Sequence, residues 1–383
     1  MKRRRARIQG YQAAAVLPTF ATLAQGSWLA QTTASRITSS GPNPDPSVTP
    51  TGNPLSQANW NSIKGTQGIA ASIDSWCGRA WDEVNKRIYV TSSGHGDGRF
   101  NSTTYYDASL GAAGSWNRFS WPSYPICADT TGINPDNTAD ARHTYSSSFV
   151  YNGYLYFSGA AVNPNVNGVA RLWRQSLTTG AMEYAPSTGL TLTNQNYFTG
   201  VTYFNGLIWC FNNYGLATIN PNDFQAGFTQ RINNQFASYW NIQDVYISMV
   251  LDESRSKIWV TGYYNGGSPA TQNIVFNISN PAAVTVSNNP TFTGNGATTW
   301  INTPYPATGY DATHSDIVGW LGGTTLYKIN LTAMTITTEA ATGGDTPAAY
   351  TANGAYNLCV SASLGVILAV NGSANPVYAY KRL

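Results

Sequence analysis

One short stretch, SSGHGDGRF over residues 92–100, gathers residue types that could do chemistry. With ARHTYSSS further along, it supplies one candidate ligand-binding cluster: His95, Asp97, Arg99, Arg142 and His143. Such a cluster would bind an acidic sugar, or a metal ion if the two imidazoles converge. In the alternative, structural interpretation, the glycines shape a sharp turn, Asp97 accepts local amide hydrogen bonds and His95 bridges to a neighbouring element. We favour the structural interpretation and expect no metal.

Known catalytic signatures are missing from the sequence. GHGDG is not the GxGxxG fingerprint that cradles phosphates, and there is no G-x-S-x-G elbow, HExxH pair or P-loop. Hydrolysis by paired carboxylates needs two acids about 5–9.5 Å apart, and the sequence does not fix such a distance. We therefore expect no catalytic residues, no enzyme activity and no cofactor.

Charge is scarce and unevenly placed. Charged residues make up 10% of the chain, against about 25% in typical soluble domains. The formal net charge is +3, and five cations lie at the N-terminal tip: Lys2, Arg3, Arg4, Arg5 and Arg7. Without them the chain has fewer basic than acidic residues. The main body therefore gives no support for sequence-specific nucleic-acid binding, and contact with a polyanion belongs to the tip.

The cysteines and the N-terminus bear on whether the chain is secreted, spans a membrane or is soluble. Cys77, Cys127, Cys210 and Cys359 are widely spaced, which favours buried free thiols over a zinc or redox motif, although Cys77 and Cys127 would pair if their loops meet. KRRRAR followed by AAAVLPTFATLA resembles a signal peptide with an interrupted apolar run. No stretch reaches the about 18 apolar residues of a membrane span. We expect a soluble chain that keeps its basic arm.

Short β-type runs recur beyond residue 59, and six of them carry an apolar core: RIYVTSSG, YLYFSGAA, LIWCFNNY, KIWVTGYY, DIVGWLGG and VILAVNG. They are spaced by roughly 50–70 residues, and each lies between a preceding apolar strand and a following third strand. Most units also show a fourth strand. Four strands per repeat predict an all-β fold, a six-bladed β-propeller of four-stranded antiparallel blades with an extended N-terminal arm.

The sixth unit reaches residue 383 after its third strand, so it needs an outer strand from elsewhere. NWNSIKG, residues 59–65, resembles the fourth strand WNRFSW, and we predict that it closes the ring. Residues 1–58 would then be a basic, proline-rich arm ahead of a propeller over residues 59–383. On this view, deleting residues 1–54 leaves stability unchanged.

The repeat also predicts on which face of the propeller each candidate residue lies. Loops between the second and third strands share a face with the connections between blades, so His95 and His143 fall on one rim. His314, in DATHSD, falls in a turn on the opposite face. Asp74 and Asp244 open inner strands and are further candidates for the rim cluster.

SGHGDG with a Tyr-rich strand after it, and then RHTYSSSFVYNGYLYFSGA, resemble the kelch-like, galactose-oxidase-like propellers of bacteriophage and bacterial proteins. The resemblance covers the first two blades best. It implies a virion protein whose arm threads into neighbouring subunits while the globular part faces outward. Copper-oxidase activity does not carry over, because no matching set of Tyr, His and thioether-linked Cys ligands is present.

We therefore expect a non-enzymatic bacteriophage virion structural protein, present in multiple copies of a symmetric assembly. Residues 1–58, with the five tip cations, would hold it to other virion subunits of the capsid, neck or tail, and its exposed face would contact a host-surface glycan. One alternative is a secreted carbohydrate-binding or carbohydrate-cleaving propeller, processed near Ala24. A second is an intracellular bacterial scaffold.

Overall fold

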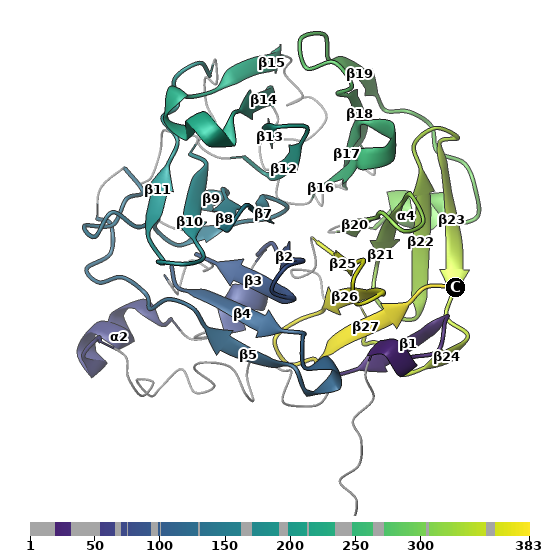
Figure 1. The fold of residues 1–383 in the computed structure, drawn as a ribbon, viewed down its shortest axis with the longest axis horizontal. Coiled ribbons are helices and arrows are strands. Elements are labelled where there is room, and N and C mark those ends of the chain that lie inside the picture. The colour runs from purple at the N-terminus through teal and green to yellow at the C-terminus, as the bar shows by residue number, and fades with distance from the viewer. Residues whose placement is uncertain are drawn as a thin grey trace, which may run out of the picture.

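The computed structural model is a ring of six blades around a central axis (Figure 1). The described residues are 20–31, 54–65, 70–74, 76–92, 99, 101–128, 131–161, 171–190, 198–212, 214–233, 247–262, 272–303, 306–349 and 357–383. The predicted all-β, six-bladed propeller of four-stranded antiparallel blades is confirmed. None of the helices in these ranges is long and apolar enough to cross a membrane.

The first three blades each contain four antiparallel strands. Blade 1 comprises β2 (Ala80–Asp82), β3 (Arg87–Thr91), β4 (Thr103–Asp107) and β5 (Ser115–Arg118). Blade 2 comprises β7 (Ser148–Tyr151), β8 (Tyr154–Phe157), β10 (Trp173–Ser176) and β11 (Met182–Tyr184), beside the short pair β6 (Arg142–His143) and β9 (Ala160–Ala161). Blade 3 comprises β12 (Gly200–Phe204), β13 (Leu207–Asn212), β14 (Gly215–Ile219) and β15 (Thr229–Asn233).

Blades 4 and 5 repeat this pattern, and blade 6 extends it. Blade 4 comprises β16 (Ile247–Asp252), β17 (Lys257–Gly262), β18 (Gln272–Asn277) and β19 (Thr285–Asn288). Blade 5 comprises β20 (Ala307–Asp311), β21 (Asp316–Trp320), β22 (Thr325–Asn330) and β23 (Thr335–Ala340). Blade 6 comprises β25 (Cys359–Ser361), β26 (Val366–Val370), β27 (Val377–Lys381), β1 (Ser27–Ala30) and β24 (Gly343–Gly344).

Short helices fill the connections. They are η1 (Phe20–Thr22), α2 (Gln57–Ile63), α3 (Ala71–Asp74), η4 (Gly111–Ala113), η5 (Pro221–Ala226), η8 (Glu253–Arg255) and α4 (Ala297–Ile301).

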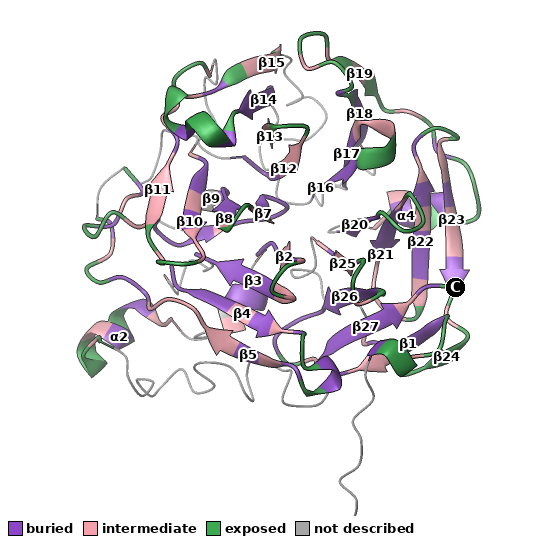
Figure 2. Ribbon diagram, viewed as in Figure 1, coloured by how far each residue is buried: buried purple, intermediate pink, exposed green. Residues whose placement is uncertain are grey.

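The second strand of every blade is buried on both faces, because each blade packs between two neighbours (Figure 2). In one interblade cluster, Ile88 and Val90 of β3 pack with Leu368 and Val370 of β26. Two-sided burial favours continuous apolar runs over strict alternation. This explains why the second strands were the clearest repeat in the sequence. The outer strands β15 and β19, by contrast, are largely exposed or half-buried.

The ring is closed by β1 instead of the predicted segment 59–65. β1 pairs antiparallel with β27, with Trp28 opposite Tyr380, and parallel with β24. Residues 57–63 form helix α2, so the prediction of a closing strand there was wrong. The Ser56 hydroxyl accepts a hydrogen bond from the Asn59 amide at 3.2 Å, which caps the helix, and Trp60 and Ile63, three residues apart, form its buried face.

The same finding shortens the predicted arm. Phe20 is buried in the cluster between blades 1 and 6, and residues 27–30 are a strand of blade 6. Residues 20–31 therefore belong to the propeller and not to a detached arm over 1–58. The tip cations Lys2, Arg3, Arg4, Arg5 and Arg7 lie outside the described residues.

Hydroxyl side chains from three blades meet near the axis of the ring. The Ser146 hydroxyl, just before β7, lies 3.2 Å from that of Ser248 in β16, and the Ser248 hydroxyl lies 2.5 Å from that of Thr308 in β20. Blades 2 and 4 are separated by blade 3, so the first contact joins two blades that are not adjacent.

Candidate functional site

Only part of the predicted rim cluster falls within the described residues. His95, Asp97 and Asp244 lie outside them. Arg99 bonds within the protein, because its Nη2 lies 2.5 Å from the Asp140 carboxylate and 2.8 Å from the Cys127 carbonyl oxygen. Its guanidinium therefore joins the loop after β3 to the connection that leads into blade 2.

Arg142 is buried in β6 beside the same acid. Its Nε donates to the Asp140 carbonyl oxygen at 3.1 Å, and its guanidinium lies 5.7 Å from the centre of the Trp173 ring. Burial lowers the pKa of Arg142 to about 10, and the Asp140 carboxylate opposes that shift, so the side chain remains charged at neutral pH. The structure thus brings Arg99 and Arg142 together around Asp140.

His143 lies between two aromatic rings. Its imidazole is 4.9 Å from the Trp76 ring and 5.8 Å from the Tyr145 ring, and its Nδ1 is 3.4 Å from the Tyr145 hydroxyl. Asp74, the other described candidate, accepts hydrogen bonds from the amide and hydroxyl of Ser373. These contacts are internal to the protein, and ligand binding by the rim cluster stays a prediction.

Replacing His143 by alanine is expected to lower the free energy of unfolding by about 1–3 kcal/mol, because two ring contacts are lost from a packed site. Urea unfolding measures the loss. His143→Phe is the control, since it keeps a planar ring and should recover at least half of the stability. Equal stability of the alanine variant and the parent chain would contradict a structural role.

All four cysteines are buried and free. Cys77 and Cys127 therefore do not form the disulfide left open by their sequence positions. Burial raises the pKa of Cys359 to about 12 and also raises that of Cys210, which keeps these thiols protonated. Neither is a nucleophile at neutral pH.

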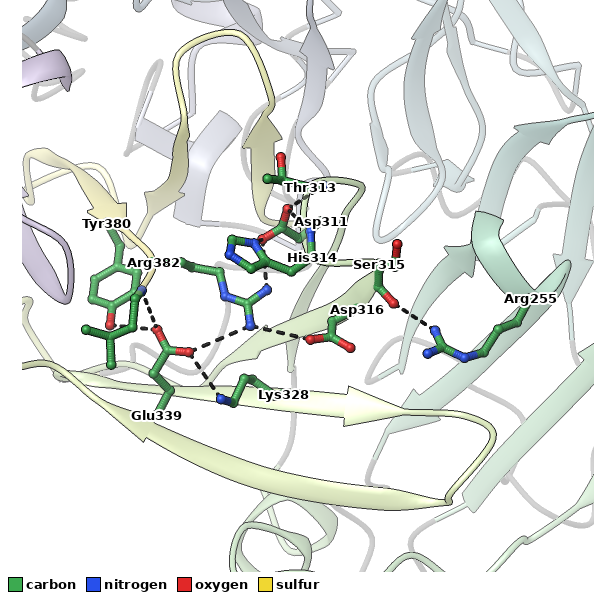
Figure 3. A network of polar contacts seen from close by, with 11 residues as sticks. Arg255, Asp311, Thr313, His314, Ser315, Asp316, Lys328, Glu339, Tyr380 and Arg382 are labelled. Carbon is green, nitrogen blue, oxygen red and sulfur yellow. Dashed lines mark hydrogen bonds and ion pairs between the residues drawn. The ribbon is translucent and has the colours of Figure 1, made fainter.

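The opposite face holds a charged network between blades 5 and 6, centred on Arg382 (Figure 3). The nearly buried guanidinium lies 2.8 Å from the Asp311 carboxylate, 3.5 Å from that of Asp316 and 3.7 Å from that of Glu339. Two like charges about 4 Å apart repel by about 4 kcal/mol at an effective dielectric constant of 20. Arg382 is thus the counterion that lets three acids share this junction.

His314 and Tyr380 complete the network. The His314 Nδ1 lies 2.7 Å from the Asp311 carboxylate, and the Tyr380 hydroxyl donates to Glu339 at 2.9 Å. Burial alone would raise the pKa of Asp311, but hydrogen bonds from Arg382 and His314 outweigh it, so that pKa lies below its usual value. Burial and the neighbouring Glu339 raise the pKa of Tyr380.

The sequence predicts His314 on this face but does not predict its partners. Asp311 ends the first strand of blade 5, and its Oδ1 accepts from the Thr313 amide at 3.0 Å. Asp82 and Asp252 accept from turn amides in the same way in blades 1 and 4. The recurring aspartate therefore shapes the turn, and Arg382, which follows β27, turns one such aspartate into an interblade link.

The N-terminal segment docks beside this network. The Trp28 ring is almost fully buried, 5.7 Å from the Trp320 ring of blade 5 and 4.9 Å from the Tyr380 ring of blade 6. Its Nε1 donates to the Thr324 carbonyl oxygen at 3.2 Å. The Ala30 amide donates to the Asp345 carboxylate at 2.7 Å. We call residues 20–31 with these contacts the closure segment.

No protein-family model and no curated protein matches the chain. Solved structures share the fold at low identity. One is a gluconolactonase from Xanthomonas campestris, 9% identical, with a TM-score of 0.48 over 81% of this chain and 87% of that one. A structure of the mitotic checkpoint complex gives 8% identity and a TM-score of 0.44 over 84% and 94%.

A further similar structure is the extracellular domain assigned to a one-component system of B. thetaiotaomicron, 14% identical over 83% of this chain, with a TM-score of 0.42. The match spans 39% of that longer chain. These likenesses concern the fold alone. The sheet topology of the chain itself defines the class, a six-bladed β-propeller closed by a strand from its own N-terminal part.

Proposed function

We propose that this chain is a non-enzymatic structural protein of a bacteriophage particle. In this proposal a kelch-like propeller is held to the capsid, neck or tail by the residues that precede Phe20, in several copies per particle. The observation that carries the proposal is the closure segment, which is built into the wall of the ring. Antiparallel pairing of β1 with β27 ties this segment to blade 6.

Pairing of β1 with β27 supports an anchor, because it makes Ser27–Ala30 part of the propeller. The Gly26 amide donates to the Lys381 carbonyl oxygen at 2.7 Å, and the Gln31 amide donates to that of Val377 at 2.8 Å, so the ladder continues beyond both ends of β1. A partner bound to the tip would therefore be joined to blade 6 through residues 8–19 and the closure segment. The tip also concentrates five positive charges on a chain that otherwise has more acidic than basic residues, which suits an acidic partner surface.

The closure segment also argues against the secreted alternative. Cleavage near Ala24 would remove Phe20, which is buried, and Leu23, which packs against the same cluster between blades 1 and 6. A processed chain would expose the apolar surface that these two side chains cover. A chain that keeps residues 20–31 fits this packing better than a chain cleaved near Ala24.

The proposal predicts that the chain travels with phage particles through its basic tip. Alanine at positions 2, 3, 4, 5 and 7 should reduce the amount bound to gradient-purified particles at least about tenfold, because exposed charge contacts supply the attraction. Quantitative mass spectrometry of particles from the host culture measures the effect. The matched control replaces the four arginines by lysine and keeps the charge, so it should bind like the parent chain.

Unfolding temperatures of the parent chain and both variants should agree, because the substitutions leave unchanged the residues of the closure segment, such as Phe20, that pack against the blades. If the alanine variant is incorporated as well as the parent chain, anchoring through the tip is contradicted. A free chain in the culture medium that begins at Gln25 would instead establish the secreted alternative.

A further inference from the structure

A pocket of about 220 Å³ opens at the junction of blades 5 and 6, beside the charged network of Figure 3. Its wall includes Thr313 and His314 from the turn of blade 5, Arg382 after β27, and the aliphatic side chains of Val360, Val366 and Ile367 from blade 6. Pockets for drug-sized ligands begin at about 300 Å³, so this one suits a smaller molecule. The wall offers both polar groups and an apolar surface.

Only some of the polar groups in the wall have hydrogen-bond or ion-pair partners among the described residues. Both terminal nitrogens of Arg382 contact carboxylates, whereas its Nε is buried and has no hydrogen-bond partner among the described residues. That nitrogen has almost no accessible surface, so a ligand in the pocket does not reach it. The His314 Nδ1 is held by Asp311, so Nε2 is the ring nitrogen left for a ligand.

Charge selects the class of ligand. The guanidinium that lines the pocket is already surrounded by the carboxylates of Asp311, Asp316 and Glu339, so an added anion would be repelled. An added cation would meet Arg382 and the neighbouring Lys381. A neutral molecule with hydroxyl groups avoids both costs, and its C–H surface can cover Val360, Val366 and Ile367.

We propose that this pocket binds a neutral, hydroxyl-rich small molecule of the size of one sugar ring. A hydroxyl group of the ligand donates to His314 Nε2, and the C–H surface of the ligand covers the aliphatic part of the wall. The Thr313 side chain is exposed at this turn and borders the pocket. The site lies on the face opposite His143, and it does not depend on attachment to a particle.

The test is a titration of the full chain with D-glucose, D-galactose and N-acetylglucosamine, followed by NMR or calorimetry. At least one sugar should bind saturably, with a dissociation constant of about 0.1–10 mM. Thr313→Trp should weaken binding at least about tenfold, because a large ring at this position would obstruct the pocket. The matched control is Val84→Trp, at the equivalent exposed position of the blade 1 turn, which should bind like the parent chain.

His314→Phe gives a second readout, because phenylalanine keeps a planar ring but lacks the Nε2 acceptor. In a variant that is shown to be folded, affinity should fall severalfold. If no sugar binds at concentrations up to about 50 mM, or if Thr313→Trp binds like Val84→Trp, the proposal is overturned. Sodium acetate is the anionic probe, and binding as tight as that of the sugars would overturn the assignment to a neutral ligand.

Discussion

Replacing Trp28 by alanine is expected to lower the free energy of unfolding by about 3–5 kcal/mol, the usual cost of truncating a buried tryptophan. The side chain fills the space between Trp320 of blade 5 and Tyr380 of blade 6, and its indole N–H bonds the Thr324 carbonyl oxygen. Its loss therefore leaves a cavity in the seam where the ring closes. Urea unfolding at neutral pH measures the change.

Trp121→Ala is the matched control, because the same atoms are removed from a half-buried ring that packs against Arg118. Its cost should be smaller by at least about 2 kcal/mol. Deletion of residues 1–31 should destabilise the domain further, since it removes the whole outer strand from blade 6. This reverses the sequence-based expectation that loss of residues 1–54 is harmless. Unchanged stability of Trp28→Ala would show that β1 does not hold the ring.

Replacing Arg382 by methionine is expected to cost about 3–5 kcal/mol at pH 7, because it leaves buried carboxylates without their counterion. Asp311 and Glu339 are 6% and 3% exposed in their side chains, and Arg382 is 6% exposed. Methionine keeps much of the volume, so the loss reports charge and hydrogen bonding. Lys328→Met is the control: its ion pair with Glu339 is 40% exposed on the lysine side and should be worth at most about 1 kcal/mol.

The loss in free energy of unfolding that Arg382→Met causes should be smaller in acid than at pH 7. In the parent chain the pKa of Asp311 lies below its usual value, so its contribution is complete above the pKa of the unfolded chain. That contribution is lost as the pH falls through the lower, folded pKa. In the variant Asp311 loses the hydrogen bond from Arg382, which lowers its pKa in the parent chain, so it takes up a proton at higher pH and its buried charge is removed. Urea unfolding at pH 7 and about pH 4 compares the two chains, and a constant deficit would contradict this account.

The architecture could be predicted because interblade packing leaves a mark in short segments. Ile88 and Val90 lie in a strand buried on both faces, and equivalent apolar runs recur in the other five blades. The closing strand could not be identified in this way. Ser27–Ala30 is a run of four residues whose partners, β27 and β24, come from distant parts of the chain. The Trp in NWNSIKG drew the prediction to a segment that its Ser56 cap makes helical.

The candidate sites likewise combine contacts that the sequence indicates with contacts that only the fold creates. The nearness of Arg142 and His143 was visible in ARHTYSSS, whereas the link from Arg99 to Asp140 joins two loops that only the fold brings together. Arg382 looked like the end of a strand. Its partners Asp311 and Glu339 lie in blade 5, so their contacts depend on how two blades pack. A turn aspartate is readable from sequence, but its counterion from a neighbouring blade is not.

Pairing of β1 with β27 sets an order for biogenesis. Trp28 leaves the ribosome early, yet Tyr380 is made about 350 residues later, roughly 20–70 s at 5–20 residues per second. During that interval the strand has no partner of its own and can enter the last blade of another copy. Crowded polysomes should therefore favour strand-exchanged dimers, and slower initiation should favour monomeric rings.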